Sequence, residues 1–365
     1  MFWLVGLVDS CGGLAPADSP LDVSTCQDNW NVILQASGNV WDIQTNMRGS
    51  GLSWSNGHLY FEYFDRAATN PGAIASISTS SSIRSYSNVA NIDPSYWWIE
   101  NDQLIYADGR YQLYGVPLAG GGQPAQLVDI AQDTPDPYFV NFALDTDAVY
   151  WVSLERAAKS WSVWRALRGS GERQQLMVMP VLNAASGEGS MLTLTRDSVM
   201  VSDGVSATLG GTLYVVPKTG GDRRVLPAPA SGWLLAANSD GTALWLESLS
   251  GGKSFRMWRS TIDGAAPTPF WPDKPPALFP TNAWSDGHGG WHLAAREYTS
   301  AKLDSESQGT TIWALDSSGH GVRLACNPLP GATSELATAL SPTTLFLLDR
   351  DESSSATKSI VSIAR

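Results

Sequence analysis

The sequence predicts an all-β protein, a seven-bladed β-propeller built from four-stranded antiparallel blades. Three observations predict it: one unit recurs along nearly the whole chain, each unit carries turn-forming residues at fixed offsets, and the last unit lacks a strand that the N-terminal segment can supply. A chain of 365 residues exceeds what one ordinary hydrophobic core supports, so an architecture that grows by repetition fits its length.

The second strand of each unit marks the repeat. The seven marker strands are Leu59-Tyr60-Phe61, Ile105-Tyr106, Val149-Tyr150-Trp151, Val199-Met200-Val201, Leu244-Trp245-Leu246, Trp291-His292-Leu293 and Leu345-Phe346-Leu347. Their starts near 59, 104, 149, 199, 244, 291 and 345 are separated by 45, 45, 50, 45, 47 and 54 residues. Blade repeats in propellers are about 40 to 50 residues long, so each unit is expected to form one blade.

Turn-forming residues divide each unit into strands. A short polar residue stands just before each marker strand, at Ser55, Asn101, Asp145, Thr195, Asp240, Asp286 and Ser341. Such residues bond their own backbone in tight hairpins. Gly-rich turns such as Gly120-Gly121-Gly122 and Gly169-Ser170-Gly171 follow further along. Each unit is therefore predicted to be a four-stranded meander.

The two ends of the chain predict how the ring closes. The seventh unit stops at its third strand, Ile360–Arg365, and two strand-like segments, Asn31–Gln35 and Val40–Ile43, precede the first unit. An N-terminal strand completing the last blade would hide an exposed edge, and we expect one of these two segments to do so. The expected organisation is a leader and tether over residues 1–28 and a propeller domain over residues 29–365.

The repeat resembles the bacterial extracytoplasmic propellers with YWTD-like units and, more distantly, the TolB-type propellers. The likeness is carried by Val149-Tyr150-Trp151 and Ile105-Tyr106-Ala107-Asp108, and the repeat covers about residues 30 to 365. YWTD propellers have six blades whereas this count is seven, and no unit carries the full tetrapeptide. The resemblance therefore implies the architecture and carries no activity with it.

The first residues resemble a bacterial lipoprotein signal. The apolar run Phe2–Val8 leads to Cys11, which would carry the lipid, although Asp9 and the lack of a basic residue before Arg48 depart from that pattern. The run is far shorter than the roughly 20 residues that span a bilayer, so no transmembrane helix is expected. We expect an extracytoplasmic chain, periplasmic or at the cell surface and lipid-anchored through Cys11, with an ordinary N-terminus as the alternative.

Two further cysteines lie near the two ends of the expected propeller, Cys26 at its start and Cys326 near its end. A pair of cysteines suits an oxidising compartment, where they would form a disulfide. Two buried free thiols are the alternative.

Charge narrows the choice of partners. The chain has 23 basic and 35 acidic residues, which gives a net charge of −12, and its largest basic cluster is the pair Arg223-Arg224. This composition argues against nucleic acid and anionic membrane surfaces as partners. A closed ring has no need to oligomerise, so a monomer is expected.

Carboxylates recur at the ends of the second strands. The set is Glu62, Asp108, Glu155, Asp203, Glu247, Glu297 and Asp349. They either accept hydrogen bonds as part of the repeat or form an acidic ring that attracts Ca²⁺ or a cationic ligand to the central channel. No other metal or cofactor is indicated, because the four histidines fall in or beside turns and within a strand.

Aromatic residues are frequent in the segments that join the blades. Those singled out as candidate ligand contacts are Trp97, Trp98, Trp233 and Trp284. Aromatic faces beside carboxylates and amides bind sugars and cationic groups. The 16 tryptophans also fit packing between blades, so both roles stay open for each ring.

No nucleophile elbow, phosphate loop, zinc helix or Cys-x-x-Cys pair is present. We therefore expect an exported binding scaffold for a protein or glycan ligand. The alternative is a metal-dependent propeller enzyme of the lyase or lactonase kind, with a divalent ion held by carboxylates over the channel. A purely structural ring is a third possibility.

Overall fold

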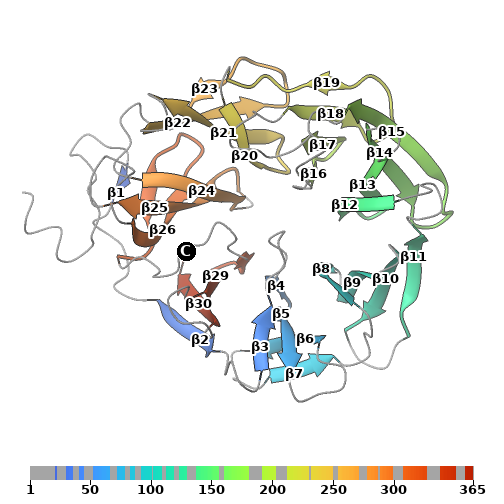
Figure 1. The fold of residues 1–365 in the computed structure, drawn as a ribbon, viewed down its shortest axis with the longest axis horizontal. Coiled ribbons are helices and arrows are strands. Elements are labelled where there is room, and N and C mark those ends of the chain that lie inside the picture. The colour runs from blue at the N-terminus through green and yellow to red at the C-terminus, as the bar shows by residue number, and fades with distance from the viewer. Residues whose placement is uncertain are drawn as a thin grey trace, which may run out of the picture.

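In the computed structural model, seven β-sheets surround a central axis (Figure 1). The structure describes residues 21–22, 30–35, 41–44, 52–65, 72–78, 83–86, 92–100, 102–108, 112–118, 123–129, 137–155, 160–180, 191–202, 212–229, 232–249, 254–270, 278–286, 288–298, 307–326, 338–350 and 358–364. None of these residues is helical, and no helix within them is long and apolar enough to cross a membrane. The prediction of an all-β ring of seven blades is confirmed.

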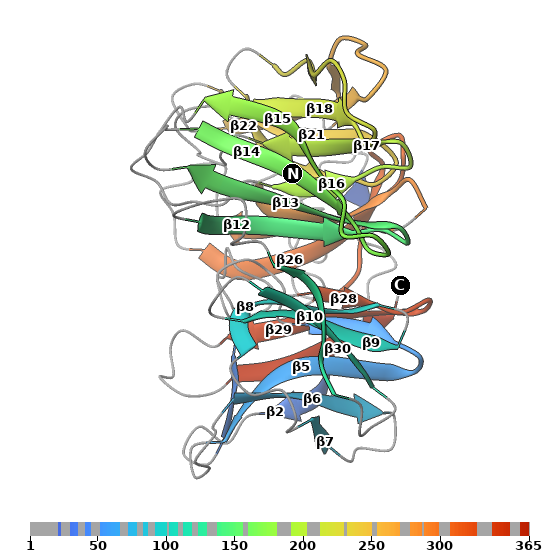
Figure 2. The same cartoon turned by 90° about the vertical axis from the view of Figure 1, so that its right-hand side faces the viewer.

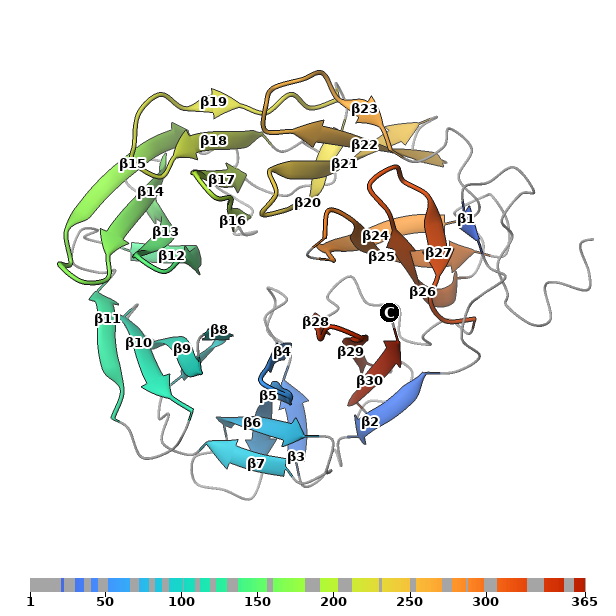
Figure 3. The same cartoon turned by 180° about the vertical axis from the view of Figure 1, so that it is seen from behind.

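Blades two to six follow the chain, each running from an innermost strand at the axis to an outermost strand at the rim (Figure 3). Blade two comprises β8 (Ile92–Glu100), β9 (Gln103–Asp108), β10 (Gln112–Pro117) and β11 (Ala125–Asp129). Blade three comprises β12 (Pro137–Leu144), β13 (Ala148–Glu155), β14 (Ser160–Leu167) and β15 (Arg173–Pro180). Blade four comprises β16 (Leu192–Leu194), β17 (Ser198–Ser202), β18 (Leu213–Pro217) and β19 (Arg224–Val225).

Blades five and six repeat the same antiparallel order. Blade five comprises β20 (Gly232–Ala237), β21 (Thr242–Leu249), β22 (Ser254–Thr261) and β23 (Thr268–Pro269). Blade six comprises β24 (Leu278–Ser285), β25 (Trp291–Tyr298), β26 (Ser307–Leu315) and β27 (Gly321–Arg323).

Blade one has a divided innermost strand. It comprises β3 (Trp41–Gln44), β4 (Leu52–Ser55), β5 (His58–Asp65), β6 (Gly72–Ser78) and β7 (Ile83–Tyr86). Both β3 and β4 pair with β5, because Trp41 lies opposite Asp65 while Leu52 lies opposite Phe61. The strand-like segment around Trp41 therefore belongs to blade one rather than to the closing blade.

The N-terminal segment closes the ring through blade seven. This blade comprises β28 (Thr338–Leu340), β29 (Thr344–Arg350), β30 (Lys358–Ala364) and β2 (Asn31–Gln35). Asn31 of β2 lies opposite Ser362, and Gln35 lies opposite Ser359. Of the two candidate segments, Asn31–Gln35 supplies the missing outermost strand, as the truncated seventh unit predicts.

A second N-terminal strand, β1 (Leu21–Asp22), was not expected. It lies parallel to β27 and extends blade six at the rim, with Leu21 opposite Gly321. The N-terminal segment thus pairs with blade six through β1 and with blade seven through β2. Pairing with the propeller begins upstream of residue 29, the expected domain boundary.

Apolar clusters fill the interfaces between blades. Because each blade has a neighbour on both faces, both sets of alternating side chains along a central strand are buried. Trp151 and Leu113 join blades two and three, whereas Trp245 and Met200 join blades four and five. The indole N–H of Trp245 donates to the Ser260 hydroxyl at 3.0 Å, which satisfies its buried polar group.

Candidate functional site

The two faces of the ring are built differently. The turns between first and second strands and between third and fourth strands lie on one face, here called the hairpin face. The links between second and third strands and between blades lie on the other, here called the connection face (Figure 2). Among the longest of these links are residues 181–191, 203–212 and 324–337. The connection face therefore carries the longer links, in which binding residues usually lie.

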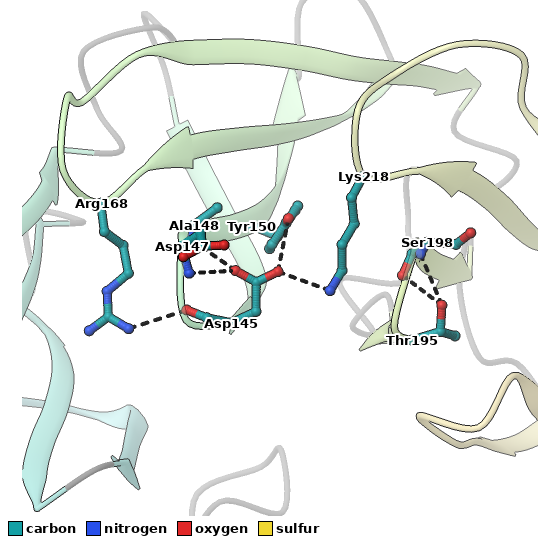
Figure 4. Close-up of polar contacts among 8 residues, drawn as sticks. All are labelled: Asp145, Asp147, Ala148, Tyr150, Arg168, Thr195, Ser198 and Lys218. Atoms are coloured by element: carbon teal, nitrogen blue, oxygen red, sulfur yellow. Dashed lines mark hydrogen bonds and ion pairs between the residues drawn. The ribbon is translucent and has the colours of Figure 1, made fainter.

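Short polar side chains cap the turns of the hairpin face. The carboxylate Oδ1 of Asp145 accepts the Ala148 backbone N–H at 2.8 Å, and the Thr195 hydroxyl accepts that of Ser198 at 2.9 Å (Figure 4). Corresponding bonds are accepted by Asp240, Asp286 and Ser341. At these five turns the predicted role of the turn-forming residue is confirmed.

An ion pair joins two neighbouring blades on this face. Lys218, which follows β18 of blade four, lies 2.9 Å from Oδ2 of Asp145 in the first hairpin of blade three. The Tyr150 hydroxyl donates to the same oxygen at 3.0 Å, and the Lys218 ammonium lies 5.7 Å from the centre of the Tyr150 ring. We call Asp145, Tyr150 and Lys218 the hairpin latch (Figure 4).

A similar contact occurs one blade earlier. Arg168, which follows β14, lies 3.4 Å from the Glu100 carboxylate of blade two and also donates to the Asp145 carbonyl oxygen at 3.2 Å. These contacts hold adjacent hairpins together, so the hairpin face has a structural role.

Electrostatics within the hairpin latch favours a charged Asp145. Burial acts to raise the pKa of this carboxyl group, but the Lys218 ammonium and the N–H groups of Ala148 and Asp147 outweigh burial and hold the pKa below its usual range. Burial, followed by the neighbouring Asp145 carboxylate, raises the pKa of the Tyr150 hydroxyl well above its usual range. Tyr150 therefore serves as a hydrogen-bond donor, not as a base.

Replacing Lys218 with methionine is expected to lower the free energy of unfolding by about 0.5 to 1 kcal/mol at neutral pH, because a partly exposed pair is screened by solvent. Folding lowers the pKa of Asp145, so the ionised carboxylate stabilises the folded state. This contribution is present above the unfolded pKa, about 4, and is lost as the pH falls through the folded pKa. The difference between wild type and variant should therefore shrink in acid. Urea unfolding across pH measures it, with Arg196→Met on the same face as the control. A loss that did not change with pH would contradict this account.

The structure describes the side chains of two of the seven predicted carboxylates. Glu62 is buried, 6% exposed. Glu247 accepts the Trp258 indole N–H at 2.7 Å, and the Arg256 guanidinium lies over the same ring at 5.4 Å from its centre. Glu247 therefore has the structural role of a hydrogen-bond acceptor within blade five. The side chains of the other five, Asp108, Glu155, Asp203, Glu297 and Asp349, lie outside the described part.

The described side chains form no cluster of metal ligands. Among them, no group of three or more His, Cys, Asp or Glu lies close enough to hold an ion. His292 is buried within β25, while His288 and His320 are exposed in turns of the hairpin face. The role of the acidic ring in Ca²⁺ binding stays a prediction.

The predicted aromatic contacts separate into different environments. Trp97 is 1% exposed and packs between blades one and two, which supports a role in packing. Trp284 lies near the hairpin end of β24 and packs between blades six and seven. The Trp98 side chain lies outside the described part. Trp233, by contrast, is partly exposed near the connection end of β20.

Trp233 belongs to an aromatic group at the interface of blades five and six. Its ring meets Phe255 edge to face, with centroids 5.6 Å apart, and Phe255 meets Phe279 at 4.6 Å. We call Trp233, Phe255 and Phe279 the aromatic trio. Phe255 was not among the predicted ligand contacts, because an apolar residue in a third strand is typical of the core. The signal that could have indicated this group was the occurrence of aromatic residues, Trp233 and Phe279, at the starts of two successive innermost strands.

Comparisons with known proteins show the fold. No protein-family model matches the chain, and no curated protein is similar in sequence. An oligogalacturonate lyase from Vibrio parahaemolyticus has a TM-score of 0.68 at 7% identity, over 93% of this chain and 95% of that one. The fold is that of a β-propeller.

Two further structures agree with it. An oligogalacturonate lyase in complex with manganese has a TM-score of 0.64 at 8% identity, over 92% of this chain and 96% of that one. The β-propeller domain of the Trilobed protease from Pyrococcus furiosus has a TM-score of 0.55 at 10% identity, over 86% of this chain and 94% of that one. At these identities the likeness concerns the architecture alone.

Proposed function

We propose that this propeller is an exported scaffold that binds a glycan on its connection face. The observation that carries the proposal is the contrast between the faces. The hairpin face is occupied by capped turns and the contacts between blades, whereas the connection face carries the longer links and the partly exposed ring of Trp233. Long links on a rigid scaffold are where binding residues concentrate.

The bonded state of Cys326 supports export. Cys326 is disulfide-bonded, and structural disulfides are typical of oxidising compartments. The other two cysteines, Cys11 and Cys26, lie outside the described part. Our proposal of a surface location includes a lipid on Cys11. Mass spectrometry of the protein purified from its native membrane fraction tests for this lipid.

Two insertions test which face binds. A biotin-acceptor peptide within the hairpin turn at residues 287–289 should leave glycan binding unchanged when the protein is captured on streptavidin. The same peptide within the link at residues 271–277 should strongly reduce it. Each protein is probed with one glycan array of neutral and acidic oligosaccharides, and melting curves confirm that both insertions fold. Binding to no glycan, or equal binding by both proteins, would refute the proposal.

A metal-dependent lyase is the second candidate, because the fold extends over nearly the full length of two oligogalacturonate lyases, one in complex with manganese. The carboxylates are chemically suited to Ca²⁺ or Mn²⁺. A rise in melting temperature with millimolar metal, together with new ultraviolet absorbance on oligogalacturonate, would support this candidate. No response in either measurement would remove it.

A further inference from the structure

The aromatic trio lies at the connection end of the interface between blades five and six. Trp233 and Phe279 are each the second residue of an innermost strand, β20 in blade five and β24 in blade six. Innermost strands lie nearest the central axis (Figure 1). These two begin at the connection face, because each follows a link between blades. Two neighbouring blades therefore carry a partly exposed aromatic ring at equivalent positions of their innermost strands.

The rings are held in place and only partly covered. Phe255, 8% exposed, lies between Trp233 and Phe279, with interplanar angles of 83° and 67°. Edge-to-face packing of this kind fixes ring orientation. Trp233 and Phe279 are partly buried and pack against the core cluster between the two blades. A supporting ring beneath two partly exposed ones gives a rigid apolar platform.

The backbone around Trp233 is shaped to present it. The Gly232 N–H donates to the Pro229 carbonyl oxygen at 3.1 Å, and a Cβ on Gly232 would lie 2.3 Å from the Pro229 ring. Only glycine permits this close approach. Trp233 follows Gly232 directly, so the tight turn fixes the backbone position from which the Trp233 side chain projects.

Each of the two innermost strands carries a β-bulge just after its aromatic residue. The register shifts between Leu234 and Ala236 in β20, and between Pro280 and Asn282 in β24. Bulges redirect side chains and are frequent beside binding sites. The bulge is a feature that several blades share, since β12 of blade three has one at the same place.

A polar residue, Asn282, lies three positions after Phe279 in β24. The side-chain oxygen of Asn282 accepts the Ala283 N–H at 2.8 Å, which fixes the orientation of the amide. Within the described part of the chain, its Nδ2 group makes no hydrogen bond, and the residue is partly exposed on the innermost strand of blade six. Nδ2 can therefore donate to a ligand hydroxyl.

The chemistry favours an uncharged sugar. Aromatic faces with a fixed amide donor provide the stacking surface and hydrogen bond that orient a small ligand. An anionic sugar would be repelled by a protein of net charge −12. We propose that the aromatic trio and Asn282 form a subsite for one pyranose ring of a neutral oligosaccharide. This inference rests on the proposed function and names the ligand class of the connection face.

Three variants test the subsite, each measured by calorimetry with the best neutral oligosaccharide from the array. Trp233→Ala and Phe279→Ala are expected to weaken binding at least about tenfold, as loss of a central contact does, and Trp233→Phe should retain most of it. Trp54→Ala is the matched control, because Trp54 is a partly buried ring stacked on Phe346 near the hairpin face. The Trp54→Ala variant should bind the oligosaccharide with the same affinity as wild type.

The outcomes separate the two proposals. If the chain binds neutral glycans and the connection-face insertion blocks them, but Trp233→Ala binds within twofold of wild type, the subsite is wrong and the proposed function stands. Selective binding of uronate oligosaccharides, or of choline used as a cationic probe, would also overturn the neutral-sugar subsite. Binding to no glycan would overturn the proposed function itself.

Discussion

Replacing Cys326 with serine is expected to lower the free energy of unfolding by about 4 to 5 kcal/mol, the upper end for a disulfide. The proposed bond to Cys26 would close a loop over most of the chain and so remove much unfolded-state entropy. Cys326 is disulfide-bonded. The parallel register of β1 on β27 places Leu21 opposite Gly321 and Asp22 opposite Val322, an offset of 300 residues. Cys26 and Cys326 are separated by the same offset, which supports Cys26 as the partner.

Peptide mapping in the absence of reductant identifies the bonded pair, and urea unfolding measures the change in stability. Cys26→Ser should be as unstable as Cys326→Ser, and the double variant no worse than either, because all three lack the same bond. Cys11→Ser is the matched control and should leave stability unchanged. A peptide that links Cys11 to Cys326, or a loss confined to one variant, would show that the assigned pairing is incorrect.

Replacing Trp245 with alanine is expected to lower the free energy of unfolding by about 3 to 5 kcal/mol, the range for deleting a large aromatic side chain from a core. Trp245 is 0% exposed and lies in the cluster that joins blades four and five. Its indole N–H is bonded to Ser260, so the change also leaves a buried hydroxyl with one partner fewer.

Trp233→Ala provides the comparison, since it removes the same side chain from a partly exposed position in the next interface. Its stability loss should be clearly smaller, because part of its ring already contacts water. Chemical unfolding of both variants under one set of conditions gives the two values. Equal losses would mean that Trp233 acts mainly in packing, and this would count against its role in the subsite.

The repeat could be predicted from the sequence because turn chemistry and strand spacing recur with every blade. Asp145 and Thr195 cap their hairpins as short polar residues do elsewhere. The closing strand at Asn31–Gln35 could be predicted because the last unit leaves an open edge. The two-residue strand Leu21–Asp22 could not, since a pairing so short has no periodic pattern.

The candidate site was less accessible to sequence reasoning. Trp97 and Trp233 both occur near the starts of units, yet Trp97 is fully enclosed and Trp233 is not. In a blade buried on both faces, alternation of side chains does not distinguish the solvent-facing end of an interface from its centre. The bulges after Trp233 and Phe279 also left no signal, because they depend on pairing geometry.

The double attachment of β1 and β2 has a kinetic consequence. Both strands leave the ribosome before any blade, but their partners β27 and β30 are among the last elements synthesised. Contacts between residues so distant in the chain form slowly, because the intervening loop must first be ordered. The earliest-made strands are thus the last to be paired, and β2, with Val32 62% exposed even afterwards, is the segment with the longest opportunity to aggregate.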